Sequence, residues 1–175
     1  MTIRLLRRIA LIGTALLFGS AAIADPPDPA HCIVPSSITL VGSRGGIPDA
    51  VAGQFAVVVR TIVNNPENGA SVVIELSACD DLRLCSDQLD PAALVNCAAK
   101  TMRKFTRLDG SVTFAVLGGS NGAGNATSLS GCGVVLANGT RIGSPSVAVL
   151  DLDGMNGVGL NDLSVWLTDF GSGTR

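Results

Sequence analysis

The feature that most restricts the fold of this chain is a set of short runs in which apolar and polar side chains alternate. Such alternation has the period of a β-strand, because successive side chains point to opposite faces of a sheet. Glycine, asparagine, proline and aspartate separate these runs and favour turns. The sequence therefore predicts an all-β sandwich in which each strand buries one face. The buried faces of the two clearest runs are formed by Val72, Ile74 and Leu76 and by Val112, Phe114 and Val116.

Two turn motifs between the runs predict β-hairpins. The first hairpin turns at NNPENG, residues 64–69, whose asparagine, proline and glycine tolerate or pre-set turn conformations. The second turns at Asp109-Gly110, a dipeptide that is strongly favoured between two alternating runs. About seven or eight strands are expected, which suits a sandwich. They lie at 33–41, 54–63, 70–76, 98–106, 111–117, 126–130, 133–137 and 145–150.

Residues 1–24 have the pattern of a secretory signal peptide. They begin with three arginines, continue with an apolar stretch from Ile9 to Phe18, and end in the small-residue sequence AIA. The stretch is shorter than the roughly 20 residues that a spanning helix needs, so an uncleaved anchor is the less favoured alternative. We expect cleavage after Ala24, a secreted or cell-surface protein without a membrane span, and an extended proline-rich tether over residues 25–32.

Composition after removal of this signal excludes some functions. Nine lysines and arginines would remain against fourteen aspartates and glutamates, a net charge of −5. No basic stripe is left to neutralise phosphates, so nucleic acid is not expected as a partner. A polysaccharide-cleaving enzyme usually has a carboxylate pair in an aromatic-lined cleft, and this chain has one tryptophan and no tyrosine. No catalytic residues are predicted.

Five cysteines fit an oxidising compartment, where disulfides persist. Cys79, Cys85 and Cys97 lie close together in the segment 79–97, and we expect one local disulfide among them. Cys32 is then expected to pair with the remaining member, which leaves Cys132 as the free thiol. With one histidine in the chain, a structural zinc site is not expected.

A helix is predicted near the C-terminus. Apolar side chains recur at helical spacing, Asn161 is the expected N-cap, and Asp162 suits the first turn. We expect the apolar face to pack against the sandwich or a second repeat, in preference to forming a ligand platform. Its residues are Leu163, Trp166, Leu167 and Phe170.

The body of the chain resembles a known family. FAVVVRTIVNNPENGASVVIEL, residues 55–76, and KFTRLDGSVTFAVLGG, residues 104–119, look like the strands and turns of bacterial immunoglobulin-like domains of the invasin and intimin type. The resemblance covers residues 33–149 and implies an immunoglobulin-like sandwich that serves as a stalk, spacer or presentation module. The cysteine-rich segment 79–97 is an insertion relative to that pattern.

Residues 150–175 are similar to one half of a dockerin-like calcium repeat, a relative of the EF-hand. In that pattern a twelve-residue loop supplies oxygen ligands and a short helix follows. The resemblance assigns three carboxylate ligands, Asp151, Asp153 and Asp162, and a carbonyl ligand, Gly157. Met155 stands where a fourth side-chain oxygen is usual, so a weak calcium site is expected.

Two functions remain from this reasoning. The favoured one is a secreted, non-catalytic immunoglobulin-like module with a dockerin-like tail, which would meet a protein or glycan partner during surface display, adhesion or extracellular assembly. The alternative is an accessory carbohydrate-binding protein associated with polysaccharide degradation.

Overall fold

The computed structural model describes residues 25–44, 47–48, 53–84, 88, 90–120, 131–154 and 159–171. Within these ranges the chain forms strands and a helix at its C-terminal side, α2 (Leu160–Gly171). The strands are β1 (Ser37–Leu40), β2 (Ser43–Arg44), β3 (Ile47–Pro48), β4 (Gln54–Val58), β5 (Ser71–Glu75), β6 (Leu82–Leu84), β7 (Leu94–Asn96), β8 (Thr101–Phe105), β9 (Ser111–Ala115), β10 (Gly118–Ser120), β11 (Val134–Ala137), β12 (Thr140–Gly143) and β13 (Ser146–Val149). The fold is thus mostly β, as the sequence predicts.

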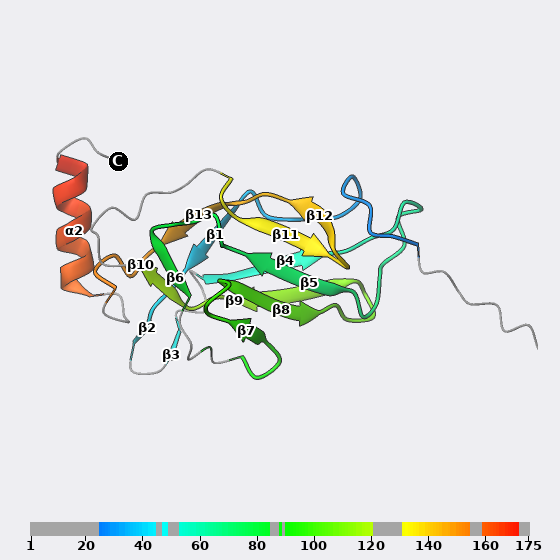
Figure 1. Cartoon of the computed structure of the whole chain (residues 1–175), viewed down its shortest axis with the longest axis horizontal. Helices are drawn as coiled ribbons and strands as arrows, with labels where there is room; N and C mark the ends of the chain where they lie inside the picture. The colour runs from blue at the N-terminus through cyan, green and yellow to red at the C-terminus, as the bar shows by residue number, and fades with distance from the viewer. Residues whose placement is uncertain are drawn as a thin grey trace, which may run out of the picture.

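The largest sheet has five antiparallel strands in the order β12-β11-β5-β8-β7 (Figure 1). Its central strand, β5, pairs with β11 on one side and with β8 on the other. The predicted alternation is confirmed there, because Val72 and Ile74 are buried while their neighbours along the strand are partly exposed. β7, inside the predicted cysteine-rich insertion, forms an edge of this sheet.

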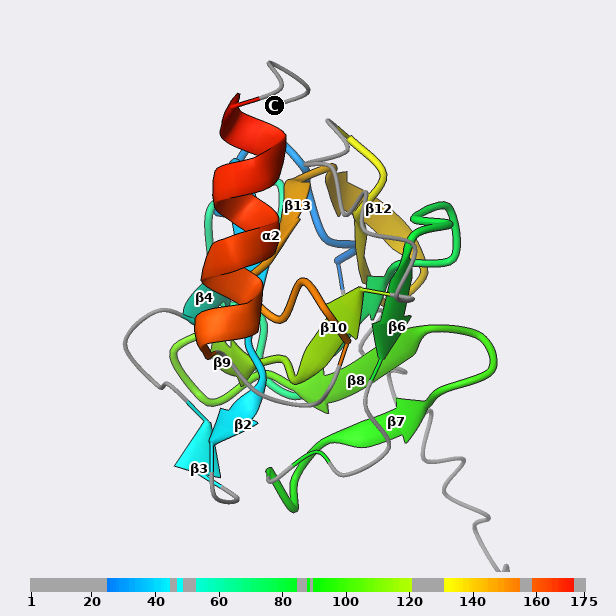
Figure 2. The same cartoon turned by 90° about the vertical axis from the view of Figure 1, so that its left-hand side faces the viewer.

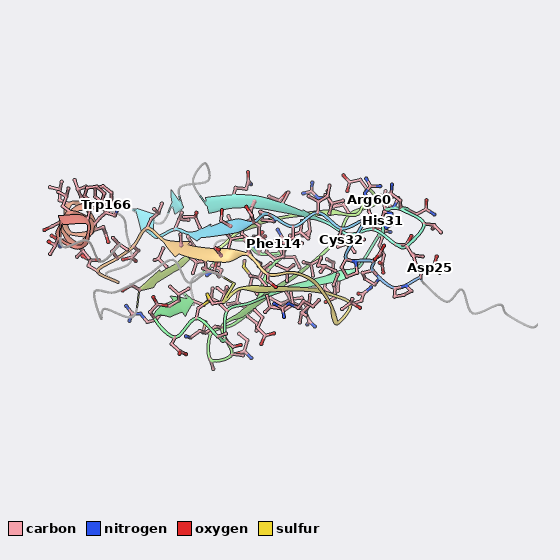
Figure 3. All side chains as sticks on the ribbon, turned by 90° about the horizontal axis from the view of Figure 1, so that it is seen from above. Asp25, His31, Cys32, Arg60, Phe114 and Trp166 are labelled. Carbon is pink, nitrogen blue, oxygen red and sulfur yellow. A yellow bond between two sulfur atoms is a disulfide. The ribbon has the colours of Figure 1, made fainter. Side chains whose placement is uncertain are left out.

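Shorter pairings build the opposite side of the molecule (Figures 1 and 3). β4 pairs with β9 in antiparallel fashion, and β1 pairs with β13 in parallel fashion. Backbone hydrogen bonds join the end of β1 to the segment after β9, since Val41 N–H donates to Val116 O and Gly118 N–H donates to Val41 O. β10 then pairs with β6. The side chains between the layers form one hydrophobic core, which includes Val57, Phe114 and Met102.

Neither predicted hairpin forms. The NNPENG segment does reverse the chain, but β4 pairs with β9 whereas β5 pairs with β8 and β11. The Asp109-Gly110 turn is also real, with Gly110 at a φ of 74° and its N–H bonded to Arg107 O. β8 and β9 nevertheless belong to different sheets. Each turn carries the chain across the core because both flanking strands have an apolar face, and burying these faces against one another is favourable.

A two-residue hairpin joins β11 to β12. Asn138 and Gly139 occupy its turn with φ values of 47° and 84°, a left-handed conformation that asparagine and glycine tolerate. The Asn138 side chain also accepts a hydrogen bond from Ser71 N–H, which fixes the hairpin to β5. The strand expected at 126–130 lies outside the described residues.

The segment 25–32 is not the extended tether that its prolines predict. Pro27 is buried and forms an antiparallel bridge with Thr61, and Asp28 N–H donates to Arg60 O at 2.8 Å. The chain then turns, because the N–H groups of His31 and Cys32 both donate to Asp28 O. Cys32 packs against the core. In the described part of the chain, no helix has both the length and the apolar character needed to cross a membrane.

Candidate metal centre

Three aspartates meet where the sandwich ends and the helix begins. Asp151 follows β13, Asp153 lies two residues later, and Asp162 stands in the first turn of α2. One carboxylate oxygen from each lies within 4.8 Å of the others. Asp151 and Asp162 are buried, with exposed fractions of 1% and 4%, and Asp153 is half-buried. The structure therefore brings together the three carboxylates that the loop pattern selects.

Asp162 joins the loop to the helix through backbone hydrogen bonds. Its Oδ1 accepts from the N–H groups of Leu152 at 2.6 Å and Asp153 at 3.1 Å. Its Oδ2 accepts from Gly159 N–H at 2.6 Å. The helix begins at Leu160, so the predicted cap Asn161 lies inside the first turn. Asp162 reaches back instead to the residue before the helix, as the acidic member of a capping box does.

Asp151 is held against β10. Its carbonyl oxygen accepts from Ser120 N–H at 2.9 Å. Its carboxylate lies over Gly119, where an added Cβ would stand 2.9 Å from Asp151 Oδ2. Only glycine leaves room for this approach, because a side chain at that position would displace the carboxylate. The position of Asp151 thus depends on the backbone of β10 as well as on β13.

Arg83 of β6 braces the loop from outside. Its Nε donates to Ser120 O at 3.1 Å, and its Nη2 donates to Gly154 O at 2.7 Å. One guanidinium therefore joins two strands to the loop that carries Asp151 and Asp153. Sequence reasoning did not find this residue, since an arginine at the exposed position of a three-residue strand carries no local signal of such a contact.

The donor set suits a hard divalent cation. It consists of carboxylate oxygens, the ligands that Ca²⁺ and Mg²⁺ prefer, and has no nitrogen or sulfur of the kind that holds zinc. Three carboxylates this close repel one another unless positive charge lies among them. Calcium takes six to eight oxygens. Met155 and the predicted carbonyl ligand Gly157 lie outside the described residues.

The apolar face of α2 is exposed. The exposed fractions are 50% for Leu163, 43% for Trp166, 53% for Leu167 and 63% for Phe170. The rings of Trp166 and Phe170 stack on one another, with centroids 5.1 Å apart and planes at 14°. The helix lies across one end of the sandwich (Figure 2), and Val165 is its side chain that packs against the core. The expectation that the predicted face packs on the chain's own sandwich is therefore wrong.

The disulfide differs from the predicted pairing. Cys79 bonds to Cys132, with 5.3 Å between their Cα atoms and a separation of 53 positions in the sequence. Cys132 is thus not the free thiol. β5 and β11 are antiparallel neighbours, so the chain that leaves β5 meets the chain that enters β11 at one end of the sheet. Proximity in sequence favoured a local bridge, whereas sheet topology decides which cysteines meet.

The remaining cysteines in the described ranges, Cys32 and Cys97, are free, and Cys85 lies outside those ranges. The expected pairing of Cys32 with a member of the 79–97 segment is therefore wrong. Cys32 Sγ accepts from Arg60 N–H at 3.3 Å and donates to Arg60 O at 3.5 Å. Burial raises the pKa of the Cys32 thiol, and the Arg60 N–H only partly opposes that effect. A raised pKa keeps a thiol protonated, which lowers its reactivity as a nucleophile.

Comparisons with known proteins add no family. No protein-family model matches the sequence, and neither the curated proteins nor the solved structures contain a significant match. The assignment of function consequently rests on the chemistry of the chain itself.

Proposed function

We propose that this chain is an exported, non-catalytic module of the immunoglobulin-like type whose C-terminal loop and helix form a calcium-dependent attachment element. It would serve surface display, adhesion or extracellular assembly. The observation that carries the proposal is the convergence of Asp151, Asp153 and Asp162 at the base of a helix with an exposed apolar face.

A cation at this place would act on the helix through its ligands. Asp151 belongs to the strand side of the junction and Asp162 to the helix side. A bound cation would neutralise their repulsion and connect the two, which would fix the direction in which α2 presents its apolar residues. Extracellular calcium sites work at about 10⁻⁴–10⁻³ M, the range expected for a loop with a methionine at one ligand position.

Export is supported by two independent features. Residues 1–24 have the pattern of a cleaved leader. The Cys79–Cys132 disulfide is of a kind that persists in oxidising compartments and is rare in the cytosol.

The single histidine does not belong to the acidic cluster. His31 pairs with Asp28, and it lies at the end of the sandwich opposite to Trp166 (Figure 3). The acidic cluster therefore has no histidine beside it to act as a general base.

The stacked pair Trp166 and Phe170 favours one alternative, an accessory carbohydrate-binding protein. Exposed aromatic rings can stack on sugars. Phe170 already covers one face of the indole, so at most one face remains for a sugar ring. Retention of the protein on an insoluble polysaccharide, and loss of that retention in Trp166→Ala, would support this alternative over attachment to a protein.

Calcium titration tests the main proposal. Trp166 is the one tryptophan, so its fluorescence reports on α2 alone. We expect a saturable fluorescence change and a matching heat signal with a dissociation constant of about 10⁻⁴–10⁻³ M. Asp153→Asn should weaken binding about tenfold or more, whereas Asp109→Asn, in the turn after β8, should leave it unchanged. An absence of heat and of any fluorescence change up to several millimolar calcium would contradict the proposal.

A further inference from the structure

The far end of the sandwich, opposite to α2, is covered by the first described residues of the chain. Pro27 bridges to Thr61, and Asp28 is hydrogen-bonded to Arg60. Asp25 lies at this same end of the molecule as His31 and Arg60 (Figure 3). The segment is therefore joined to the fold from Pro27 onward, two residues after the residue that signal cleavage is predicted to expose.

Two buried oxygen atoms at this end have no hydrogen-bond partner among the described residues: Glu67 Oε2 and Thr61 Oγ1. Thr61 is only 8% exposed. The other carboxylate oxygen, Glu67 Oε1, accepts from Asn138 Nδ2 at 2.6 Å. Buried acceptors are nearly always satisfied in folded proteins, so two such atoms at one end of a sandwich indicate that a donor belongs there.

The two acceptors lie on adjoining segments of one turn. Thr61 N–H donates to Asn65 O at 3.0 Å, and Glu67 N–H donates to Val59 O at 3.0 Å. Because Arg60 pairs with Pro66, Glu67 lies opposite Val59, and the side chains of Thr61 and Glu67 share one face of this turn. The backbone near Asp25 runs along the other side of Thr61 through the Pro27 bridge.

The negative charges of Glu67 and Asp25 favour a cation at this end of the sandwich. Burial raises the pKa of Glu67, the hydrogen bond from Asn138 lowers it, and the negative charge of Asp25 raises it again. The Asp25 carboxylate is therefore near enough to affect Glu67, and it is unfavourable there. A positive group with several N–H donors would satisfy both buried acceptors and offset both negative charges.

We propose that Glu67 and Thr61 form the docking site for the α-ammonium group of Asp25, which cleavage of the signal peptide creates. Water is added across the Ala24–Asp25 peptide bond, which leaves a carboxylate on Ala24 and an amine on Asp25 that takes up a proton. The uncleaved chain offers a single neutral N–H at this position, whereas the cleaved chain offers three N–H donors and a positive charge. The proposal rests on export and cleavage as part of the proposed function, but not on the calcium site.

This docking would make cleavage a step in folding as well as in export. The mature chain would gain an ion pair at one end of the sandwich, and the uncleaved precursor would keep that end less stable. If the pKa of the α-ammonium group is raised in the folded protein, the gain in stability depends on pH. The stabilisation is complete below the ordinary pKa of an α-amine and is lost as pH rises through the raised folded value.

The test compares two exported proteins in EDTA, so that calcium plays no part. One begins at Asp25, and the other carries two added glycines before Asp25, which moves the ammonium group without changing its charge. The starting residue of each is checked by mass. We expect the α-amine of the protein beginning at Asp25 to titrate about one unit above its ordinary value of about 7.7–8.0, as followed by NMR. Its melting temperature should exceed that of the extended protein at pH 7, and the difference should disappear above about pH 10.

Substitutions identify the partners. Glu67→Gln should return the α-amine to its ordinary pKa, Thr61→Val should lower the pKa in part, and Glu75→Gln, at the other glutamate of the chain, should leave it raised. The proposal is overturned if the α-amine of the protein beginning at Asp25 titrates at its ordinary value. It is also overturned if both proteins melt at the same temperature, or if the exported protein begins elsewhere than Asp25.

Discussion

Replacing both Cys79 and Cys132 by alanine should lower the free energy of unfolding by about 4 kcal/mol. The disulfide joins positions 53 residues apart. For a closed loop of this length, the cross-link lowers the conformational entropy of the unfolded chain by about 14 cal/mol/K. This corresponds to about 4 kcal/mol of stabilisation at 25 °C, which the double variant loses. Both cysteines are buried, with exposed fractions of 0% and 9%, so alanine keeps the site apolar and adds no unsatisfied hydroxyl. Domains of this size are stable by about 5–15 kcal/mol, so the loss is a large share of the total.

Urea denaturation followed by far-ultraviolet circular dichroism measures this change. Tryptophan fluorescence is the wrong probe, because Trp166 lies exposed on α2 and reports on the helix rather than on the core. The slope of unfolding against urea should also increase in the double variant, since an unfolded chain without the cross-link exposes more surface. Cys97→Ala is the matched control, because Cys97 is free and exposed and its loss should change stability by less than about 0.5 kcal/mol.

The same double variant should weaken the metal site. Cys79 precedes β6 by three residues, and β6 carries Arg83, which is bonded to Gly154 in the acidic loop. Release of Cys79 therefore loosens the brace on that loop, and the calcium midpoint should rise. A stability loss below about 1 kcal/mol would refute the estimate from loop length. An unchanged calcium midpoint would refute the link from Cys79 through β6 to the loop.

Three further predictions concern single side chains. Asp162→Asn should reduce the helical circular dichroism signal, because the carboxylate that accepts three backbone hydrogen bonds at the helix start is replaced by an amide; an unchanged signal would contradict its place at the helix start. Trp166→Ala should change stability by less than about 0.5 kcal/mol, because the side chain is exposed, and a larger loss would indicate that it packs within its own chain. Burial alone would raise the pKa of Asp90, but hydrogen bonds, chiefly from Lys104, lower it overall. Asp90→Asn should therefore be less stable than the parent at pH 7, with a difference that is lost as pH falls through the lowered pKa of Asp90, and a difference that persists in stronger acid would contradict the ion pair.

Local periodicity was sufficient to predict which side chains of a strand are buried. Val72, Ile74 and Leu76 are all buried, as the alternation in that run predicts, and so are Val112, Phe114 and Val116. This succeeds because the side-chain period of a strand is fixed by backbone geometry and needs no knowledge of the partner strand. The all-β class follows from the same signal.

Strand partners could not be predicted in this way. A turn such as Asp109-Gly110 reverses the chain in a hairpin and also between two layers, and the local sequence does not distinguish these outcomes. The choice depends on which apolar faces meet across the core, a property of the whole sheet. The same limit explains the error at Cys132, whose partner is set by the pairing of β5 with β11.

The acidic cluster was predictable because its members lie within twelve residues. A loop that returns to the helix start has few ways to place Asp151, Asp153 and Asp162 apart. The residues that hold the cluster in place are distant in sequence, since Gly119 and Arg83 come from β10 and β6. Neither has a local pattern that identifies it. Sequence thus locates the candidate ligands, whereas the structure is needed to find what positions them.

The acidic cluster beside α2 and the proposed docking site at Glu67 and Thr61 lie at opposite ends of the sandwich. A last prediction follows from this separation. Asp25 and Arg60 mark one end and Trp166 the other, with the buried Phe114 between them (Figure 3). Sites that share no partner and lie far apart contribute additively, within about 0.3–0.5 kcal/mol. In calcium, the stability losses from Asp153→Asn and Glu67→Gln should therefore sum in the double variant. A deviation above about 1 kcal/mol would mean that the core transmits the state of one end to the other, and the sandwich would then be a coupled element rather than a rigid spacer between two independent attachments.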